Sequence, residues 1–226
     1  MIAIITAMDV ELEHILSRLE NAREVHRPGL QGYAGTLCGQ EVIAAVCGVG
    51  KVCAAQCTQL LISEYKPAYV LHSGIAGAVG EGIGHLDVVV ARELTYRDMK
   101  EKTKREFLPF GGYFVADPKV TVALRKACPE SHLGCIATGD LFVNDPVEKE
   151  RLQRDYNALC AEMEGAAVAH VCTVNRVPFG VIRCISDLAN DVAYDDMESF
   201  EQRAARKSAD ILCDAIGFLT GKENAQ

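Results

Sequence analysis

The segment CAEMEGAAVAHVC, residues 160–172, joins two apolar runs across a pair of carboxylates, Glu162 and Glu164. Its first part is typical of a buried strand, and the part that follows Glu164 is typical of a helix. Burying an unpaired carboxylate costs several kcal/mol, so two acids at such a junction need either partners or a function. The segment therefore predicts a strand that runs directly into a helix, with acids where the strand ends.

The same alternation of strand and helix extends along the chain in both directions. Strands are expected at 1–7, 67–74, 85–96, 133–140 and 178–187, and a strand pair around a Gly-Gln turn is expected within 32–48. Helices are expected at 9–20, 50–65, 117–128 and 195–220, with Asp117 and then Asp195 or Asp196 as caps of the last two and Pro118 at a first helical position. This pattern predicts an α/β fold, a three-layer sandwich whose central, mixed but mostly parallel twisted sheet is flanked by helices. The sequence contains no linker or repeat, so we expect a single domain over residues 1–226.

Composition narrows the class of protein. The chain has 226 residues, 49% hydrophobic and 24% charged, with a formal net charge of −8. Its densest basic run, KEKTKRE at 100–106, is interrupted by glutamates and predicts a solvated loop, so we expect no nucleic-acid partner. The N-terminal residues lack the basic start of a signal peptide, and no apolar run reaches the roughly 20 residues of a membrane span. We expect a cytoplasmic protein without a membrane partner.

The ten cysteines show neither a CxxC motif nor a zinc-ligand spacing with histidine. Most of them lie in apolar runs, where cysteine behaves as a small hydrophobic residue. We therefore expect free thiols, no metal site and no cofactor. The cysteines are Cys38, Cys47, Cys53, Cys57, Cys128, Cys135, Cys160, Cys172, Cys184 and Cys213.

Two glycine-rich loops resemble nucleotide-phosphate motifs in part, and a third could contact a ligand. GVGKV (48–52) lacks the first glycine of a P-loop and the hydroxyl residue that would hold magnesium. GEGIG (80–84) leads into a strand instead of the helix that a dinucleotide motif requires. SGIAGAVG (73–80) would let a ligand approach the backbone closely, although a plain loop is an equal alternative.

Three carboxylates follow different predicted strands: Glu11, Glu164 and Asp187. Each has a simpler explanation as a cap or as an acid near a helix N-terminus. However, ligands of such sheets bind beyond the carboxyl ends of the strands, where all three side chains would meet. Convergent acids without metal-ligating histidines indicate acid–base chemistry and recognition of hydroxyl groups, which suits a sugar-containing substrate.

Six motifs together resemble the bacterial 5′-methylthioadenosine/S-adenosylhomocysteine nucleosidases of the purine nucleoside phosphorylase and uridine phosphorylase superfamily. The motifs are AMDVELEHI (7–15), GVGKVCAA (48–55), SGIAG (73–77), TGDLFV (138–143), AEMEGAAVAHVC (161–172) and VIRCISDLAND (181–191). The resemblance implies a nucleoside phosphorylase-like fold and hydrolysis of the N9–C1′ bond of adenine nucleosides, in methionine salvage. The products would be adenine and a 5-substituted ribose, from methylthioadenosine, adenosylhomocysteine or 5′-deoxyadenosine. It also implies a homodimer.

Site residues are implied by the same resemblance. Asp187 would donate a proton to adenine N7, with Ser186 placing it, and Glu11 would activate the attacking water. Glu164 would bind the ribose hydroxyls, and Glu162 would lie near the ribose and the water.

The remaining implied contacts concern the base and the sugar. Phe142 would stack on adenine, the backbone of Val143 would read the base edge, and Met163 would pack under the sugar. Arg183 would neutralise part of the acidic cluster. The other lining residues would be Met8, Val49, Ala76, Gly77 and Met197.

Alternative functions remain open at this point. Phosphate-using relatives need arginines in the loop at 7–11 and before Ser73, and neither stretch has one, which favours water over phosphate. The alternatives are a phosphorolytic enzyme, a hydrolase of another 6-substituted purine nucleoside such as a futalosine-type substrate, and a non-catalytic nucleoside sensor.

The sequence departs from the family pattern at several positions. Ile75 stands where the family usually has serine, Ala78 replaces the last glycine of that loop, and the segment 97–114 diverges. In the family that segment lines the 5′-substituent pocket, partly from the neighbouring subunit, so the 5′-group is left open, with Phe107, Pro109 and Met197 as candidates.

Overall fold

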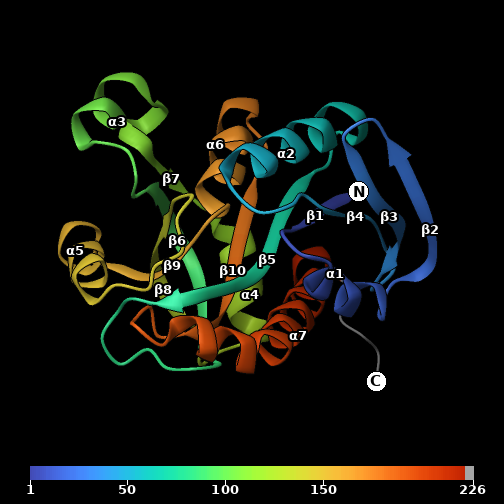
Figure 1. The fold of residues 1–226 in the computed structure, drawn as a ribbon. Coiled ribbons are helices and arrows are strands. Elements are labelled where there is room, and N and C mark those ends of the chain that lie inside the picture. The colour runs from blue at the N-terminus through green and yellow to red at the C-terminus, as the bar shows by residue number, and fades with distance from the viewer. Residues whose placement is uncertain (222–226) are drawn as a thin grey trace.

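A ten-stranded mixed sheet runs through the computed structural model, which describes residues 1–221 (Figure 1). Every strand predicted from the sequence is present, with small shifts at the ends. The strands are β1 (Ile2–Thr6), β2 (Glu20–Arg27), β3 (Leu30–Leu37), β4 (Gln40–Val46), β5 (Tyr69–Ala78), β6 (Val88–Tyr96), β7 (Tyr113–Val115), β8 (His132–Thr138), β9 (Ala158–Glu162) and β10 (Phe179–Asp187).

The strand order explains where a site can form. It is β10-β6-β8-β9-β5-β1-β4-β3-β2, with β7 paired to β6. Because β10 also pairs with β5, the strands β5, β10, β6, β8 and β9 close on themselves like a small barrel. β5 lies parallel to both β1 and β10, so these three strands end on the same side of the sheet. The residues that follow them therefore gather at one mouth.

Helices cover both faces of the sheet, which confirms the predicted three-layer α/β architecture (Figure 1). α1, α4 and α7 pack together on one face, and α2 packs with α6 on the other. Each face has its own buried apolar cluster, with Leu12, Leu124 and Leu212 on the first side and Ala54 and Ala167 on the second. The helices are α1 (Asp9–Leu16), α2 (Lys51–Tyr65), α3 (Glu101–Phe107), the 3-10 helix η1 (Pro109–Gly112), α4 (Pro118–Ala127), α5 (Pro146–Tyr156), α6 (Gly165–Asn175) and α7 (Ala193–Thr220).

The first helix is shorter than predicted, and a strand follows it that the sequence did not reveal. α1 ends at Leu16 instead of at residue 20, and Glu20 begins β2. β2 pairs only with β3, and nearly all of its residues are exposed. An edge strand that is exposed to solvent on both faces shows no alternation of apolar and polar residues, so its sequence does not indicate a strand.

The basic run at 100–106 is not the solvated loop that its composition predicted, because residues 101–107 form α3. Lys104 is the reason: its side chain is fully buried and donates hydrogen bonds of 3.0 Å to Thr95 Oγ1 and to the Tyr96 carbonyl. Its ammonium also contacts the Glu101 carboxylate and lies over the rings of Tyr113 and Tyr156. A buried, fully partnered lysine anchors the divergent segment to the sheet, which a charge count cannot anticipate.

Two further helices differ from the sequence prediction. α5 was missed, although Asp145 caps it and Pro146 occupies its first position, the same Asp-Pro signature that marked α4 correctly. α7 begins at Ala193, so Asp195 and Asp196 lie in its first turn and neither is its cap. Acids in a first turn stabilise the helix through its dipole without capping it.

The predicted free thiols are confirmed, since each of the ten cysteines is unpaired. Within residues 1–221 we find no helix with both the length and the apolar character needed to cross a bilayer.

Candidate active site

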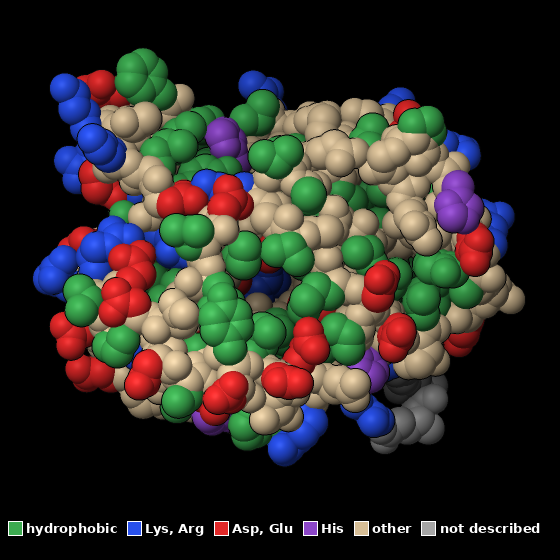
Figure 2. Space-filling view, viewed as in Figure 1, with side chains coloured by type: hydrophobic (Ala, Val, Ile, Leu, Met, Phe, Trp, Pro, Cys, Tyr) green, Lys and Arg blue, Asp and Glu red, His purple; other side chains and the backbone are tan. Residues whose placement is uncertain are grey.

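A cavity of about 240 Å³ lies at the mouth where β1, β5, β9 and β10 end. Figure 2 shows this face of the molecule hollowed near its middle, with hydrophobic side chains around the opening and acidic ones close by. The lining includes the acids and the base- and sugar-contacting residues predicted above except Val143, which lines a smaller adjoining cavity together with Gly77, Phe142, Met163 and Asp187. The other candidates, Arg183, Phe107 and Pro109, line neither cavity. The residues that line the main cavity are Ala7, Met8, Glu11, Val49, Ile75, Ala76, Gly77, Phe142, Ala161, Glu162, Met163, Glu164, Ser186, Asp187 and Met197.

Glu11 reaches the cavity from the first turn of α1. Its side chain is buried, and its two carboxylate oxygens accept hydrogen bonds from the backbone N–H groups of Ala7 at 2.8 Å, Met8 at 3.1 Å and Ile75 at 3.1 Å. Burial raises the pKa of Glu11 above its ordinary value, although the Arg183 charge and these hydrogen bonds oppose the rise. Glu11 is therefore a fixed carboxylate whose pKa lies above that of an exposed glutamate, as a proton acceptor requires.

Asp187 closes β10 and lines the same cavity. Its carboxylate accepts hydrogen bonds from Ser186 Oγ at 2.9 Å and from the Ala189 backbone N–H at 3.0 Å, so its orientation is fixed. Burial raises the pKa of Asp187. A buried acid with a raised pKa keeps its proton to higher pH than an exposed aspartate, which suits a proton donor.

Glu164 occupies the N-cap position of α6, but its side chain does not cap that helix. Instead, Glu164 Oε1 accepts a hydrogen bond of 2.7 Å from the backbone N–H of Gly50. Burial and the neighbouring Glu162 charge raise the pKa of Glu164 to about 8. Its carboxyl group therefore lines the cavity instead of stabilising its own helix, which corrects the simple first-turn interpretation of this acid.

Glu162 performs the capping that Glu164 does not. Its Oε2 accepts hydrogen bonds from the backbone N–H groups of Glu164 at 3.0 Å and Gly165 at 2.7 Å, and its Oε1 accepts one from the Thr138 hydroxyl. Burial opposes its ionisation, but the Arg183 charge and the hydrogen bonds from Thr138 and Arg183, acting together with its other neighbours, lower the pKa of Glu162. Glu162 is thus an ionised structural acid at the edge of the cavity, and the two acids of the motif have separate tasks.

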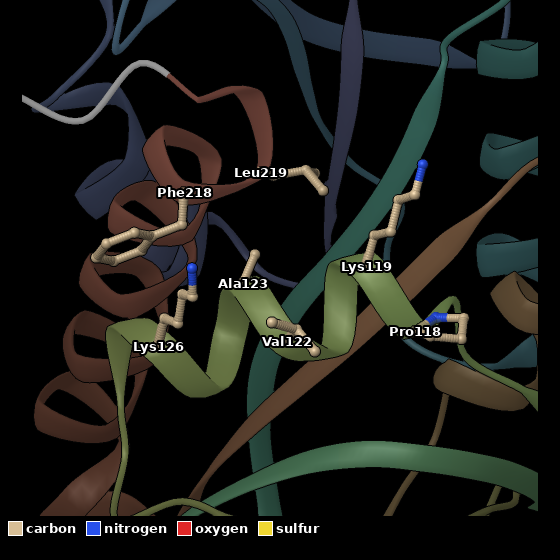
Figure 3. A pocket seen from close by; sticks show the side chains of 7 residues that line it. All are labelled: Pro118, Lys119, Val122, Ala123, Lys126, Phe218 and Leu219. Carbon is tan, nitrogen blue, oxygen red and sulfur yellow. The ribbon is translucent and has the colours of Figure 1, made fainter.

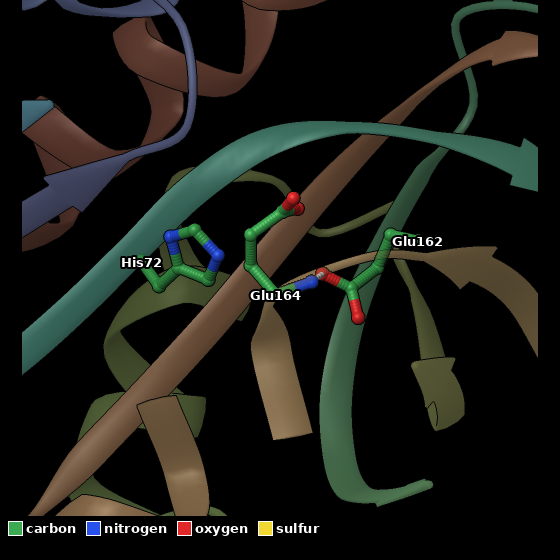
Figure 4. A group of neighbouring side chains, drawn as sticks. All are labelled: His72, Glu162 and Glu164. Atoms are coloured by element: carbon green, nitrogen blue, oxygen red, sulfur yellow. Dashed lines mark hydrogen bonds between the residues drawn. The ribbon is translucent and has the colours of Figure 1, made fainter. Parts of the chain in front are cut away.

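A cluster of His72, Glu162 and Glu164 has the spacing of a metal site, because one ligand atom of each lies within 4.8 Å of the others (Figure 4). Arg183 already supplies the cation there. Its Nη2 lies 2.5 Å from His72 Nε2 and 2.5 Å from Glu162 Oε2. A divalent ion would have to displace a buried guanidinium from both partners, so the donor set does not fit a resident metal.

The loop that carries Phe142 is held by Arg97. Arg97 is buried and its Nη2 donates to the backbone carbonyls of Gly139 and Leu141, while its Nη1 lies 3.4 Å from Glu148 Oε1. The Phe142 ring lines the cavity and stacks on Tyr194 of α7, with 4.4 Å between ring centroids. An aromatic face that is already supported from behind is a suitable platform for a flat heterocycle.

Another cavity, of about 400 Å³, lies between α4 and α7 (Figure 3). Its side chains are Pro118, Lys119, Val122, Ala123, Lys126, Phe218 and Leu219. It contains two lysines but no carboxylate, histidine or hydroxyl group that could move a proton. The acidic cavity is therefore the candidate active site.

Two residues that support the site were missed from the sequence, His72 and Arg97. His72 interrupts the apolar strand YVLHSG, and a polar residue inside a buried strand is a usable signal. Arg97 gave no such signal, because it follows a strand directly and resembles an exposed loop residue. Its burial is decided by the 139–143 loop, which folds over it.

Comparisons with known proteins agree with this geometry. The family model for the phosphorylase superfamily matches residues 1–217. The 5′-methylthioadenosine/S-adenosylhomocysteine nucleosidase of Shewanella piezotolerans is 34% identical over 224 residues, which cover 92% of this chain and 95% of that protein.

Solved structures show the same architecture. The crystal structure of the Neisseria meningitidis 5′-methylthioadenosine/S-adenosylhomocysteine nucleosidase in complex with methylthio-immucillin-A has a TM-score of 0.91 at 29% identity, covering 95% of this chain and 97% of that one. The native structure of the Helicobacter pylori futalosine hydrolase has a TM-score of 0.88 at 29% identity, covering 95% and 96%. The chain therefore belongs to the phosphorylase superfamily and, within it, to the 5′-methylthioadenosine/S-adenosylhomocysteine nucleosidases.

Proposed function

We propose that this protein hydrolyses the N-glycosidic bond of 5′-methylthioadenosine and S-adenosylhomocysteine, releasing adenine and the 5-substituted ribose. The observation that carries the proposal is the convergence of Glu11, Glu164 and Asp187, from three separate elements, on one cavity. The site therefore offers a proton acceptor, a hydroxyl ligand and a proton donor around a space that fits a nucleoside.

Each acid has a step in this reaction. Asp187 donates its proton to N7 of adenine, so the base leaves with the electron pair of the C1′–N9 bond as a neutral purine. The ribosyl ring gains positive charge as that bond breaks, and Glu164 stabilises it while accepting hydrogen bonds from the ribose hydroxyls. Glu11 accepts a proton from the water whose oxygen attacks C1′. Its three backbone donors hold it in place for that attack.

Water is the preferred nucleophile over phosphate. The cavity lining within the described residues contains neither lysine nor arginine, and Arg183 is committed to His72 and Glu162 below it. A phosphate dianion would face three carboxyl groups without a free cation, which is strongly unfavourable at low dielectric. The test is an assay for free adenine from methylthioadenosine with and without inorganic phosphate. Formation of 5-methylthioribose at the same rate in both supports hydrolysis, whereas a strict phosphate requirement with a ribose 1-phosphate product contradicts it.

The 5′-substituent is assigned to the apolar end of the cavity. Met8, Val49, Ile75 and Met197 are among the apolar residues of the lining, and a thioether chain is compatible with such a surface. A panel of methylthioadenosine, adenosylhomocysteine, 5′-deoxyadenosine, adenosine and inosine measures the preference. A futalosine-type nucleoside belongs in that panel, because a structural relative with the same fold is a futalosine hydrolase.

We further propose a cytoplasmic homodimer that acts in methionine salvage. Large apolar side chains are exposed on and beside α3, with Phe107 at 75%, Phe110 at 78% and Val115 at 65% exposure. A patch of this kind is typical of a surface that another protein covers. Light scattering coupled to gel filtration distinguishes a dimer from a monomer of 24.5 kDa, and a monomeric mass with full activity would contradict the dimer.

A further inference from the structure

His72 is a buried histidine that sits below the active site and is not one of its lining residues. It lies in β5, and its Nδ1 is 2.9 Å from the carbonyl oxygen of Ile5 in β1. A carbonyl can only accept, so Nδ1 carries the proton and Nε2 is left as an acceptor. Burial and the neighbouring Arg183 charge lower the pKa of His72 to about 3, so the ring stays neutral. His72 therefore presents one fixed acceptor to Arg183.

Arg183 is buried, and its guanidinium donates a hydrogen bond to that acceptor. Its Nη2 donates to His72 Nε2 and to Glu162 Oε2, each at 2.5 Å, and its Nη1 donates to the carbonyl of Ile182 at 3.1 Å. The side chain is 1% exposed, so no water can replace a lost partner without a rearrangement. Figure 4 shows these two partners, His72 and Glu162, on opposite sides of Glu164. The guanidinium thus depends on His72 for one of its two side-chain partners.

The same guanidinium lies beside the carboxylate that is assigned to activate water. Both groups border Gly74, where a Cβ atom would lie only 2.7 Å from Glu11 Oε1 and 3.2 Å from Arg183 Nη1. Because Gly74 has no side chain, the Arg183 guanidinium can lie close to the Glu11 carboxylate. The other groups that act on Glu11 are the Glu164 carboxyl, the Cys47 thiol and the backbone donors of the neighbouring strand ends. Among these, Arg183 supplies the positive charge.

We propose that His72 is a positioning residue that holds the Arg183 guanidinium beside Glu11, so that this carboxylate stays ionised for water activation. The inference rests on the proposed hydrolytic function, in which Glu11 is the base. His72 itself touches neither substrate nor water. Its role is to stop the guanidinium from withdrawing toward Glu162 and leaving Glu11 without a positive neighbour.

The decisive variant is His72→Leu, which keeps an apolar bulk but removes the acceptor. Without Arg183 in place, only the backbone hydrogen bonds still oppose the effect of burial on Glu11, so its pKa rises and its ionised fraction at acidic pH falls. We expect kcat at pH 6 to fall about tenfold relative to wild type and the deficit to shrink to about threefold or less at pH 8. KM should change by less than about twofold, because the variant leaves the lining of the cavity intact.

Two further variants separate positioning from packing. His72→Gln carries a neutral amide oxygen that reaches Arg183, so it should restore the wild-type dependence of kcat on pH. Leu71→Ala, the neighbouring residue on the opposite face of β5, makes a cavity in the other core cluster. It should lower the melting temperature while its pH profile keeps the wild-type shape.

The position of Arg183 gives a readout that does not depend on turnover. Crystal structures of the Leu and Gln variants should show the guanidinium displaced from Gly74 in the first and retained in the second. An unmoved guanidinium in His72→Leu, or a rate deficit that is the same at pH 6 and pH 8, overturns the inference. Failure of the proposed function is distinct, since the wild-type protein would then release no adenine while the Arg183 displacement would still be seen.

Discussion

The carboxylate of Glu164 accepts a 2.7 Å hydrogen bond from the backbone N–H of Gly50, a residue 114 positions earlier in the chain. This contact draws Glu164 away from the N-terminus of its own helix and into the cavity. Glu162 takes over the vacant backbone donors of that helix. One short motif thus provides a structural acid and, in the proposed function, a ligand for the substrate.

Asp187→Asn should reduce kcat by at least about 100-fold, because an amide cannot protonate the leaving base. Binding of a non-hydrolysable adenine nucleoside analogue, measured by calorimetry, should stay within a few-fold of wild type. Ser186→Ala is the matched control, since it removes one of the two hydrogen bonds to the same carboxylate and should cost much less. Turnover of Asp187→Asn at the wild-type rate would reject the proton-donor role.

The pKa of Glu164, raised to about 8, predicts a pH dependence of kcat/KM. Only the ionised carboxylate stabilises the positive ribosyl ring fully, and a raised pKa leaves that form depleted at pH 6 and increasingly populated toward pH 8. We therefore expect kcat/KM to increase over this interval in the wild type. In Glu164→Gln the value should be lower throughout and should lack this rise. A rise of the same size in the variant would assign the titration to another group.

Gly77→Ala should damage activity far more than stability. The added Cβ would lie 2.6 Å from Asp187 Oδ1 and 3.3 Å from Ala189 Cβ, so the carboxylate would have to move. A displaced proton donor should lower kcat by about tenfold or more. Gly84→Ala is a suitable control, because its Cβ would meet its nearest atom at 3.8 Å. Steady-state kinetics and a melting curve on both variants test the difference.

Arg97→Gln should raise KM for adenine nucleosides by about threefold to tenfold, with a smaller effect on kcat. The arginine holds the carbonyls of Gly139 and Leu141, and without it the loop that carries Phe142 loses its support. Arg92→Gln, which removes an exposed arginine whose guanidinium pairs with Glu93, should leave both constants unchanged. Equal losses of kcat and affinity in Arg97→Gln would place its effect on the chemistry instead of the base platform.

The apolar periodicity of the strands and helices was sufficient to predict the α/β sandwich. An element that packs against the core has apolar residues at the buried positions, and this spacing is visible in the sequence. β2 and α3 escaped prediction for the opposite reasons. β2 is stabilised by backbone hydrogen bonds to β3 while its side chains stay in water. α3 buries the charge of Lys104 against hydrogen-bond partners in β6, Thr95 Oγ1 and the Tyr96 carbonyl, and the residue types of α3 itself do not show this. Neither kind of stabilisation leaves a local pattern.

The sequence by itself determined which acids stand at strand ends, and hence that Glu11, Glu164 and Asp187 would share one mouth of the sheet. Only the tertiary structure decided what each acid does there. The direction of Glu164 depends on Gly50, the ionisation of Glu162 depends on Arg183, and Arg183 in turn depends on His72. Hydrogen bonds and charges act over a few ångströms in space, whatever the separation along the chain, so residue order alone cannot specify these pairs.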